Sequence, residues 1–596
     1  MDNVLMVLSK LDWSIIIIYM LISVAVGLYF TKRGSKGLLE YFVAGREVNW
    51  WLAGTSIVAT SFAADTPLAI ASIVRTRGLQ GNWYWWSGVM GGVLCVYFYA
   101  RLWRRANLIT DAEFMEIRYY GKPAAFLRGF HAFYRSIFWN SVVLGWVILA
   151  MYKIVHILLG WPKVFSTWIL VFIAVIYIFF SGLWGVIATD FFQFILAMTG
   201  CIILAGIVIV KTGGPLALVT KAVASARAAN TMQLQSRVVD SSQLINIFPN
   251  LQSSQLAVIT FLVFILVQWW GGGEGGGFLA QRLFSCKNEK HSLFAVLWYN
   301  FAHYAVRPWP WIVVGLASLI YFPNIADPET AYPKMMIQFL PNGLRGMMVA
   351  AFLAAFMSTV VTHINWGASY LVNDLYKRFL VRNAQEKHYV RMSRVGIIIM
   401  TGLAGFACLM MNSIYSAWLF VMGLMGGTCV IVLLRWYWWR INVWSEITSL
   451  IATVVVSLSL LVPAVGKFIG LPLLYTDDYY PIRFVLILVL CTLASLLVTF
   501  LTPPEPEGQL EKFYRRVRPG GWWGPIAEKC RDVKKLRLGK PEIISWFLTV
   551  ISIYAALFGL GWLVMGEYIK GIVAVAVCIV TIIIILQEIG KMEWEH

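Results

Sequence analysis

The sequence predicts an all-α protein that crosses a membrane many times and contains two inverted repeats. The 596-residue chain is 60% hydrophobic and 13% charged, with a mean hydropathy of +0.73. Apolar runs of about 20 residues recur along it, the length that a helix needs to cross about 30 Å of hydrocarbon. Two of these runs are interrupted, and the second lies five spans after the first. Paired interruptions of this kind are the sequence signature of an inverted-repeat membrane fold.

The hydropathy pattern predicts about fifteen spans. They are centred near Ile17, Ile57, Leu94, Val143, Val171, Ile195, Phe264, Val313, Phe352, Ile398, Leu424, Val455, Leu488, Ile551 and Val577. With the N-terminus outside, about 32 Lys and Arg residues fall in cytoplasmic segments and about 14 in exterior ones, so the positive-inside rule favours this orientation. The formal charge of +19 then faces anionic lipid headgroups, which argues against a nucleic-acid partner. We expect a multi-pass protein of the cell membrane, with the bacterial inner membrane favoured.

The order of spans, loops and charge runs divides the chain into seven parts. They are an extra N-terminal helix and loop (1–48), the first repeat (49–211), an exterior loop (212–254), the second repeat (255–440), two further helices (441–502), a basic cytoplasmic linker (503–541) and two C-terminal helices (542–596). Acidic residues precede the first span and no small-residue cleavage site follows it, so we expect it to be retained.

The two interrupted spans carry polar residues at membrane depth. The first, within residues 50–74, contains ATSFAADTP at 59–67, where a proline removes a backbone donor and frees a carbonyl one turn earlier. The second, within residues 256–282, contains GGGEGGG at 271–277. Irregular backbone at this depth must be buried in protein or line water, so a binding site is expected between the two breaks. Two kinks that arose independently are the alternative.

A cluster of hydroxyl groups lies in a third hydrophobic segment, at about residues 347–372. Ser358 and Thr359 are adjacent, and Thr362 lies three to four residues on, so part of the cluster shares one helical face. Helix packing is one interpretation, because Ser and Thr are common where membrane helices touch. A face directed at a cavity is the other.

Enzyme motifs are absent from the sequence. It contains no HExxH, GxSxG or Walker loop, and its eight cysteines form no CxxC pair. We therefore expect no enzymatic activity. A passive channel stays open as an alternative, because helix breaks and hydroxyls also line pores.

Four motifs in order resemble those of the sodium:solute symporters, a family that includes the sodium/glucose, sodium/proline and sodium/sialic acid cotransporters. They are GREVNWWLAGTS at 45–56, SGLWGV and TDFFQ at 181–193, QRLFSCK at 281–287, and MST at 357–359 continuing to NDLYKRF at 373–379. The agreement covers about residues 10–505. The resemblance implies a five-plus-five inverted repeat of the leucine-transporter type, and sodium-coupled symport of a small organic solute by alternating access.

The resemblance also implies a sodium site between the first and eighth repeat helices. Its oxygens would be the carbonyls of Ala59, Phe62 and Ala355 and the hydroxyls of Ser358 and Thr359. A set of about five oxygens with little net charge suits a hard monovalent cation.

Asp190, in the fifth repeat helix, is costly within a membrane unless it is solvated, paired or protonated. In some family members the matching acid helps to bind a second sodium or lies on the exit path, and here Ser358 and Thr362 could join it. Val361 stands where a second-site hydroxyl is expected, so we predict one sodium per cycle. A charge at the start of a helix is the alternative interpretation of Asp190.

The substrate cavity is expected to combine carboxylates, amides and aromatic faces. The candidates are Thr60, Ser61, Asp65, Thr66, Gln268, Trp269, Trp270, Glu274, Phe278 and Trp418. Such a set suits a sugar or polyol, which stacks its ring and donates its hydroxyls. The alternatives are an amino acid, sialic acid or carboxylate symporter, proton coupling through Glu274, and an interfacial belt for the tryptophans. An anionic substrate would need a basic partner, for which Arg135 and Arg307 are available.

We expect the remaining partners to be lipid and, at most, further copies of the chain. The protein is predicted to work as a monomer or a weak homo-oligomer.

Overall fold

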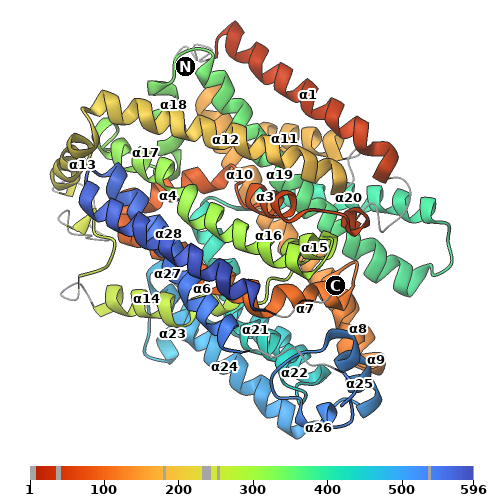
Figure 1. Ribbon diagram of the computed structural model, residues 1–596. Helices are drawn as coiled ribbons and strands as arrows, with labels where there is room; N and C mark the ends of the chain where they lie inside the picture. The colour runs from red at the N-terminus through yellow and green to blue at the C-terminus, as the bar shows by residue number, and fades with distance from the viewer. Residues whose placement is uncertain are drawn as a thin grey trace.

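The computed structural model describes residues 8–34, 42–178, 183–230, 243–250, 255–533, 539–592 and 594. These residues are almost entirely helical, and the β pairing within them is limited to two isolated bridges, Val48 with Cys286 and Trp438 with Trp522. Figure 1 shows how the α-helices are arranged, and short 3₁₀ and π-helical segments, called η here, interrupt them in the sequence.

The helices of the first half run from residue 10 to residue 230. They are α1 (Lys10–Gly34), η1 (Ala44–Arg46), α3 (Trp50–Thr60), α4 (Asp65–Arg77), η2 (Leu79–Asn82), α5 (Trp83–Trp86), α6 (Gly88–Leu94), η3 (Cys95–Tyr99), α7 (Ala100–Ala106), η4 (Asp111–Glu113), α8 (Phe114–Arg118), α9 (Gly121–Phe133), η5 (Tyr134–Trp139), α10 (Asn140–Leu159), α11 (Lys163–Ile178), α12 (Leu183–Thr212) and α13 (Pro215–Asn230). The predicted exterior loop thus contains a helix, α13.

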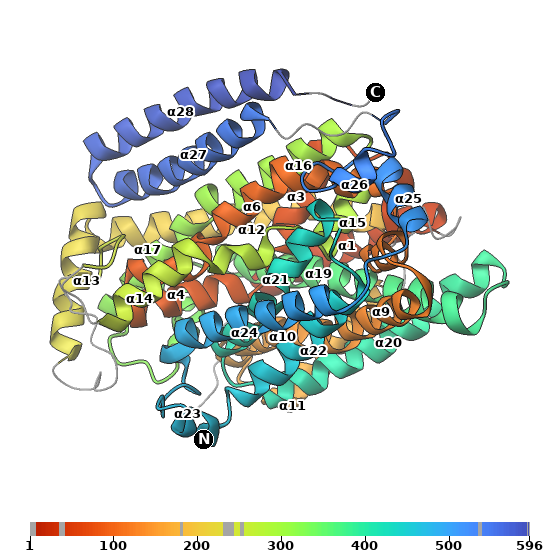
Figure 2. The same cartoon turned by 90° about the horizontal axis from the view of Figure 1, so that it is seen from below.

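The helices of the second half begin at residue 255. They are α14 (Gln255–Leu266), η7 (Gln268–Gly272), α15 (Phe278–Ser285), α16 (Glu289–Phe301), η8 (Ala302–Val306), α17 (Pro308–Tyr321), η9 (Pro328–Thr330), α18 (Ala331–Phe339), α19 (Leu344–Ser369), η10 (Tyr370–Leu380), α20 (Glu386–Met410), α21 (Ile414–Tyr437), α22 (Val443–Ser459), α23 (Pro463–Phe468), η11 (Asp477–Tyr479), α24 (Tyr480–Leu501), α25 (Glu507–Val517), α26 (Gly524–Ala527), α27 (Lys540–Val564) and α28 (Tyr568–Gly590). Helices α13 and α25 lie at opposite ends of the bundle in both views (Figures 1 and 2).

Nine helices among the described residues are long and apolar enough to cross a membrane, and α3 with α4 forms a further span bent by 58°. The sequence predicts about fifteen spans. Two of the predicted spans correspond to apolar helices of fewer than 18 residues, Lys163–Ile176 and Val443–Ser459, which fall short of the length needed to cross.

The break between α3 and α4 follows from the local sequence. At the end of α3, the Ser61 amide donates to the Ile57 carbonyl (3.1 Å) and the Phe62 amide to the Ala59 carbonyl (3.0 Å). Helix α4 then begins at Asp65, and Pro67 lies in its first turn, where a missing N–H leaves no carbonyl unpaired. The chain changes direction here, by 58° between α3 and α4.

The glycine-rich segment produces the second break. Helix α14 stops at Leu266, and no α-helix forms again before Phe278. Gly275 has a φ of +76°, and a Cβ there would lie 2.3 Å from the Cys95 sulfur, so both its backbone angle and its surroundings require glycine. Both breaks therefore lie where the sequence predicts them.

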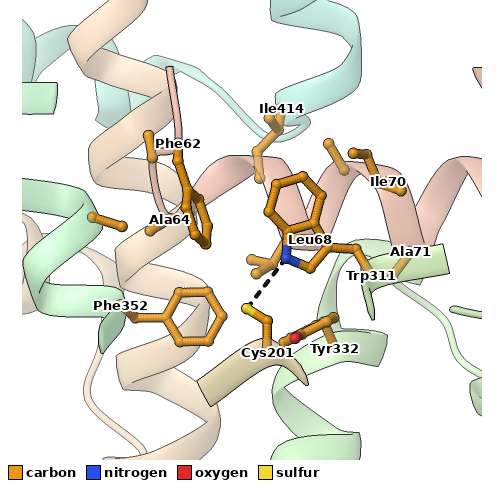
Figure 3. Close-up of a cluster of buried hydrophobic side chains, with 14 of the residues drawn as sticks. Phe62, Ala64, Leu68, Ile70, Ala71, Cys201, Trp311, Tyr332, Phe352 and Ile414 are labelled. Carbon is orange, nitrogen blue, oxygen red and sulfur yellow. Dashed lines mark hydrogen bonds between the residues drawn. The ribbon is translucent and has the colours of Figure 1, made fainter. Parts of the chain in front are cut away.

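An apolar cluster packs against the first break (Figure 3). The Phe62 ring lies 4.9 Å from the Trp311 ring of α17, and the Trp311 indole donates to the Cys201 sulfur of α12 (3.2 Å). Phe352 of α19 completes the cluster, which thus joins three helices to the break. Within a membrane such contacts act through close packing rather than through escape from water.

The two C-terminal helices belong to the bundle, and Figure 2 shows them side by side along one edge. Helix α27 is fixed along its length by polar contacts. Arg101 of α7 pairs with Glu542 (2.9 Å), and the Tyr97 hydroxyl lies 2.7 Å from the Thr549 hydroxyl. The Trp309 indole donates to the Leu557 carbonyl (2.7 Å). The hairpin therefore packs against η3 and α7 at one end and against α17 at the other.

Glu329, between α17 and α18, is predicted to be a strong contributor to stability. Its buried carboxylate accepts from the Lys153 ammonium (2.6 Å) and from the Ile414 amide at the start of α21 (2.9 Å). Replacing Glu329 with alanine should cost about 3 kcal/mol, because it removes the buried one of the two carboxylates that pair with Lys153 and leaves that lysine with Asp327 (2.7 Å), whose side chain is 44% exposed. Thermal unfolding of the detergent-purified protein measures this loss.

The matched control for this prediction is the exposed Glu567–Lys570 pair. Replacing Glu567 with alanine should leave the melting temperature unchanged, since exposed ion pairs contribute little. Equal losses of melting temperature in Glu329→Ala and Glu567→Ala would contradict the stabilising role assigned to Glu329.

Candidate functional site

A cavity of about 420 Å³ lies between the two helix breaks. Eight of the ten predicted substrate residues line it: Thr60, Ser61, Asp65, Thr66, Gln268, Trp269, Phe278 and Trp418. The volume is in the range of pockets that enclose small organic molecules. The two breaks, more than 200 residues apart in the sequence, thus contribute to one site.

Glu274 and Trp270 do not line the cavity, contrary to expectation. The Glu274 carboxylate accepts from the Arg435 guanidinium (2.5 Å) and from the Trp436 indole (2.5 Å), and Arg435 also pairs with Glu446 (2.5 Å). A carboxylate buried among these donors joins the glycine-rich segment to α21. Its position is explained by this ion cluster and not by contact with a ligand.

One wall of the cavity is aromatic. The Tyr84 and Trp418 rings are stacked, with centroids 6.2 Å apart and an interplanar angle of 10°. The Trp418 indole donates to the Asp65 carboxylate (3.1 Å), which orients both groups. The Gln268 amide nitrogen donates to the Tyr84 carbonyl (2.5 Å), while its oxygen has no partner among the described residues. That oxygen is available to a ligand hydroxyl.

Three π-helical segments contribute further lining residues, of which the sequence analysis named only Arg135, as a basic partner for an anionic substrate. They are Cys95 from η3, Trp139 and Arg135 from η5, and His303 and Tyr304 from η8. A π-helical segment inserts a residue into an α-helix and re-aims the side chains around it, and such segments are frequent at functional sites. No residue pattern in the sequence marks them. Arg135 and Arg307, noted from their positions in or near spans, both line the cavity.

The predicted sodium ligands lie where α19 meets the break of α3. The Thr359 hydroxyl donates to the Thr60 carbonyl (2.7 Å), and the Ser358 hydroxyl donates to the Asp190 carboxylate (2.6 Å). Ala59, Phe62 and Ala355 are buried on the same two elements. Because each hydroxyl directs its proton at another acceptor, its oxygen lone pairs remain free for a cation.

Asp190 is fully buried within a polar network rather than exposed at a helix start. Its carboxylate accepts from the Ser56 and Ser358 hydroxyls, and the Arg282 guanidinium lies 3.9 Å away. Arg282 also donates to the hydroxyls of Ser56 (3.2 Å) and Thr362 (2.8 Å). Arg282, which the sequence analysis did not assign to the site, is therefore the counter-charge of Asp190.

Comparison with known proteins identifies the family. The model of the sodium:solute symporter family matches residues 41–453, more than two thirds of the chain. The chain belongs to the sodium:solute symporter family. It is 23% identical to a sodium/glucose cotransporter 4 of Danio rerio over 87% of this chain and 81% of that protein. It is 24% identical to a sodium/glucose cotransporter of Vibrio parahaemolyticus over 85% of this chain and 94% of that protein.

A solved structure shares the fold of this symporter. It is described as the substrate-bound outward-open state of a Na⁺-coupled sialic acid symporter, with a TM-score of 0.64 and 18% identity. The match covers 84% of this chain and 99% of the other. The likeness shows a shared all-helical fold. Membership of the family makes this chain a sodium-coupled solute symporter of a membrane, with sodium as the coupling ion.

The four family motifs of this symporter meet in the buried network around Asp190. Ser56 ends the first motif, Asp190 belongs to the second, Arg282 to the third and Ser358 to the fourth. Residues 181 and 182 of the second motif lie outside the described residues. Motifs that are scattered over more than 300 residues thus become one hydrogen-bonded cluster beside the predicted sodium ligands.

Proposed function

We propose that this symporter takes up a small sugar-like solute together with one sodium ion by alternating access. The observation that carries the proposal is the junction of α3 and α19, where the Ser358 and Thr359 hydroxyls donate elsewhere and keep their lone pairs available. The sodium ligands are the carbonyls of Ala59, Phe62 and Ala355 together with these two hydroxyls. The relatives whose names specify glucose, and a sodium/mannose cotransporter of Bos taurus that is 25% identical over 67% of this chain, support a sugar-like solute.

One sodium per cycle is supported by Arg282. A second cation beside Asp190 and Thr362 would lie where the guanidinium already donates to Thr362 and faces the carboxylate. Two positive charges around one buried carboxylate would repel each other. Asp190 therefore acts through its pairing with Arg282, and Thr362 holds the guanidinium in place.

The architecture we propose has about fifteen spans, an exterior N-terminus and five-plus-five repeats at residues 49–211 and 255–440. One helix precedes the repeats, residues 441–502 add two more, and residues 542–596 form the C-terminal pair. Basic residues such as Arg105, Arg128 and Arg515 belong to the elements grouped at the α25 end of the bundle. The positive-inside rule makes that end cytoplasmic.

Alternating access follows from the position of the cavity. Sodium binds at the junction of α3 and α19 and holds it together, the solute closes the aromatic wall around itself, and the breaks then open toward the opposite side. For an uncharged solute, moving one sodium ion through 100 mV contributes about 2.3 kcal/mol, equivalent to nearly two decades of concentration.

Uptake into proteoliposomes tests this proposal. With an inward sodium gradient we expect internal labelled solute to exceed the external concentration, and with potassium in place of sodium we expect only equilibration. Collapse of the sodium gradient by an ionophore should release the accumulated solute. Flux that equilibrates without regard to sodium would establish a passive pore, and accumulation driven by a proton gradient would establish proton coupling.

A further inference from the structure

We infer that Asp111 of η4 is a positioning residue of the transport cycle, which bonds the second helix break to η10 and thereby keeps the cytoplasmic floor of the cavity closed. The inference rests on the proposed symport and its orientation, and it concerns a residue outside both proposed ligand sets. It begins from Gly277, where the second break ends and α15 follows at Phe278. Both of these residues line the cavity.

Asp111 joins two parts of the molecule that are far apart in the sequence. One oxygen of its buried carboxylate accepts from the Gly277 amide (2.8 Å), and the other accepts from the Tyr370 hydroxyl. Tyr370 is the first residue of η10, which continues α19, the helix that carries Ser358 and Thr359. One carboxylate therefore bonds the second break to the helix of the proposed sodium site.

The segment around Asp111 is fixed to η10 on both sides. The Thr110 hydroxyl donates to the Asp374 carboxylate (2.7 Å), and the Asn373 amide donates to the Glu113 carboxylate (2.7 Å). These bonds hold the segment on η10, whereas alternating access requires the breaks to shift relative to their surroundings. The bond from Asp111 to the second break therefore crosses between a fixed part and a moving part.

This bond lies at the cytoplasmic end of the cavity. The η4 segment follows α7 and precedes α8, and both of these helices lie against α25, at the end that the positive-inside rule makes cytoplasmic. Trp366, one turn before Tyr370, lines the cavity, and the two rings lie 5.2 Å apart. A Cβ on Gly277 would lie 3.2 Å from the Trp366 ring, so the break and α19 are in close contact there. The Asp111 carboxylate fastens this contact.

A carboxylate in this position opposes opening toward the cytoplasm. While the floor is closed, both oxygens of Asp111 have a donor. When the second break moves away from η10, the carboxylate keeps the Tyr370 hydroxyl and loses the Gly277 amide, and a hydrogen bond to a charged acceptor is stronger than one between neutral groups. Loss of Asp111 should therefore favour the inward-open form by about tenfold.

Access to the cavity from each side of the membrane tests the inference. Val143 of α10 lines the cavity and belongs to neither proposed ligand set, so Val143→Cys introduces a reporter thiol. A membrane-impermeant maleimide is added to inside-out and to right-side-out vesicles without sodium, and peptide mass spectrometry measures labelling at position 143. We expect Asp111→Ala to raise the cytoplasmic labelling rate by about tenfold and not to raise the exterior rate.

Two further variants isolate the bond. Tyr370→Phe keeps the ring but frees Asp111 from η10, so cytoplasmic labelling should rise here also. Added to Asp111→Ala, the same substitution should have no further effect, because the link is already broken. The matched control is Glu113→Ala, which removes a carboxylate of the same segment whose bond runs to Asn373 of η10. It should leave the ratio of the two labelling rates unchanged.

Thermal unfolding of the purified variants verifies that they are folded, and Tyr370→Phe carries the test if Asp111→Ala is not. Cytoplasmic labelling that stays at the parent's rate in the folded variants would overturn the inference. Labelling that rises equally from both sides, or equally in Glu113→Ala, would overturn it too, since it would show a general loosening of the helices. Sodium should slow cytoplasmic labelling of the parent. If sodium has no effect while Asp111→Ala still raises the rate, the proposed sodium coupling fails and the role of Asp111 stands.

Discussion

Replacing Thr359 with valine is expected to raise the sodium concentration needed for half-maximal uptake by about 100-fold or more, while leaving the fold intact. Valine keeps the shape of the side chain and removes only the hydroxyl that donates to the Thr60 carbonyl. Loss of that oxygen takes away one cation ligand and also the bond that joins α19 to the break of α3. Mutating residues that only contact the ligands of a metal ion commonly lowers metal affinity by about 10- to 100-fold. Removing a ligand itself should therefore lower the affinity by at least as much (~100-fold).

The measurement is the sodium concentration that gives half-maximal uptake. Thr359→Ser should stay close to the parent, because serine supplies the same oxygen. The matched control is Thr401→Val in α20, since the Thr401 hydroxyl is equally buried but bonds only the Ile397 carbonyl of its own helix (2.6 Å). If Thr359→Val and Thr401→Val change the sodium concentration for half-maximal uptake equally, Thr359 is not a sodium ligand.

Removing either charge of the Asp190–Arg282 pair is expected to destabilise the protein by about 3–5 kcal/mol, because the remaining charge is buried and unpaired. Both side chains are completely buried, and their oxygen and nitrogen atoms lie 3.9 Å apart. The double variant Asp190→Asn/Arg282→Gln should recover most of the loss, since it leaves two neutral amides among the Ser56, Ser358 and Thr362 hydroxyls. Thermal unfolding of the parent and the three variants gives the coupling energy.

A second readout separates pairing from ordinary packing. In Arg282→Gln the Asp190 carboxylate faces a gap of neutral groups, so added sodium should raise the melting temperature of this variant more than that of the parent. We expect this rise in melting temperature because a sodium ion bound beside Asp190 would replace the missing guanidinium and stabilise the folded state. Additive losses in the double variant, with no extra stabilisation by sodium, would show that the two residues act independently.

The sequence alone located both helix breaks, because proline and glycine act on the backbone at their own positions. Helix α3 ends at Thr60, and α-helix is absent between Leu266 and Phe278, within the segments predicted from ATSFAADTP and GGGEGGG. Eight of the ten proposed substrate residues line the cavity, and seven of these lie in or next to the two breaks, the eighth being Trp418 of α21. Local chemistry was sufficient for this part of the site.

The residues that the sequence did not place depend on contacts between distant segments. Glu274 resembled a ligand because a lone carboxylate among glycines needs a partner, and its partner, Arg435, lies 161 residues further on. Arg282 was visible within a family motif, but its pairing with Asp190 is a property of the packed helices. The π-helical segments η5 and η8 re-aim Arg135 and His303 without any signature in composition or spacing.

The Arg282 guanidinium limits the number of sodium ions that each proposed transport cycle can move. An arginine that occupies the place of a second cation limits each cycle to one sodium ion. A tenfold sodium gradient and 100 mV together then supply about 3.7 kcal/mol for an uncharged solute. With an uncharged solute each cycle moves one net positive charge inward, so the membrane voltage contributes to the driving force throughout. Such a carrier would concentrate its solute beyond what the sodium gradient alone allows, and it would lose that additional driving force in a depolarised cell.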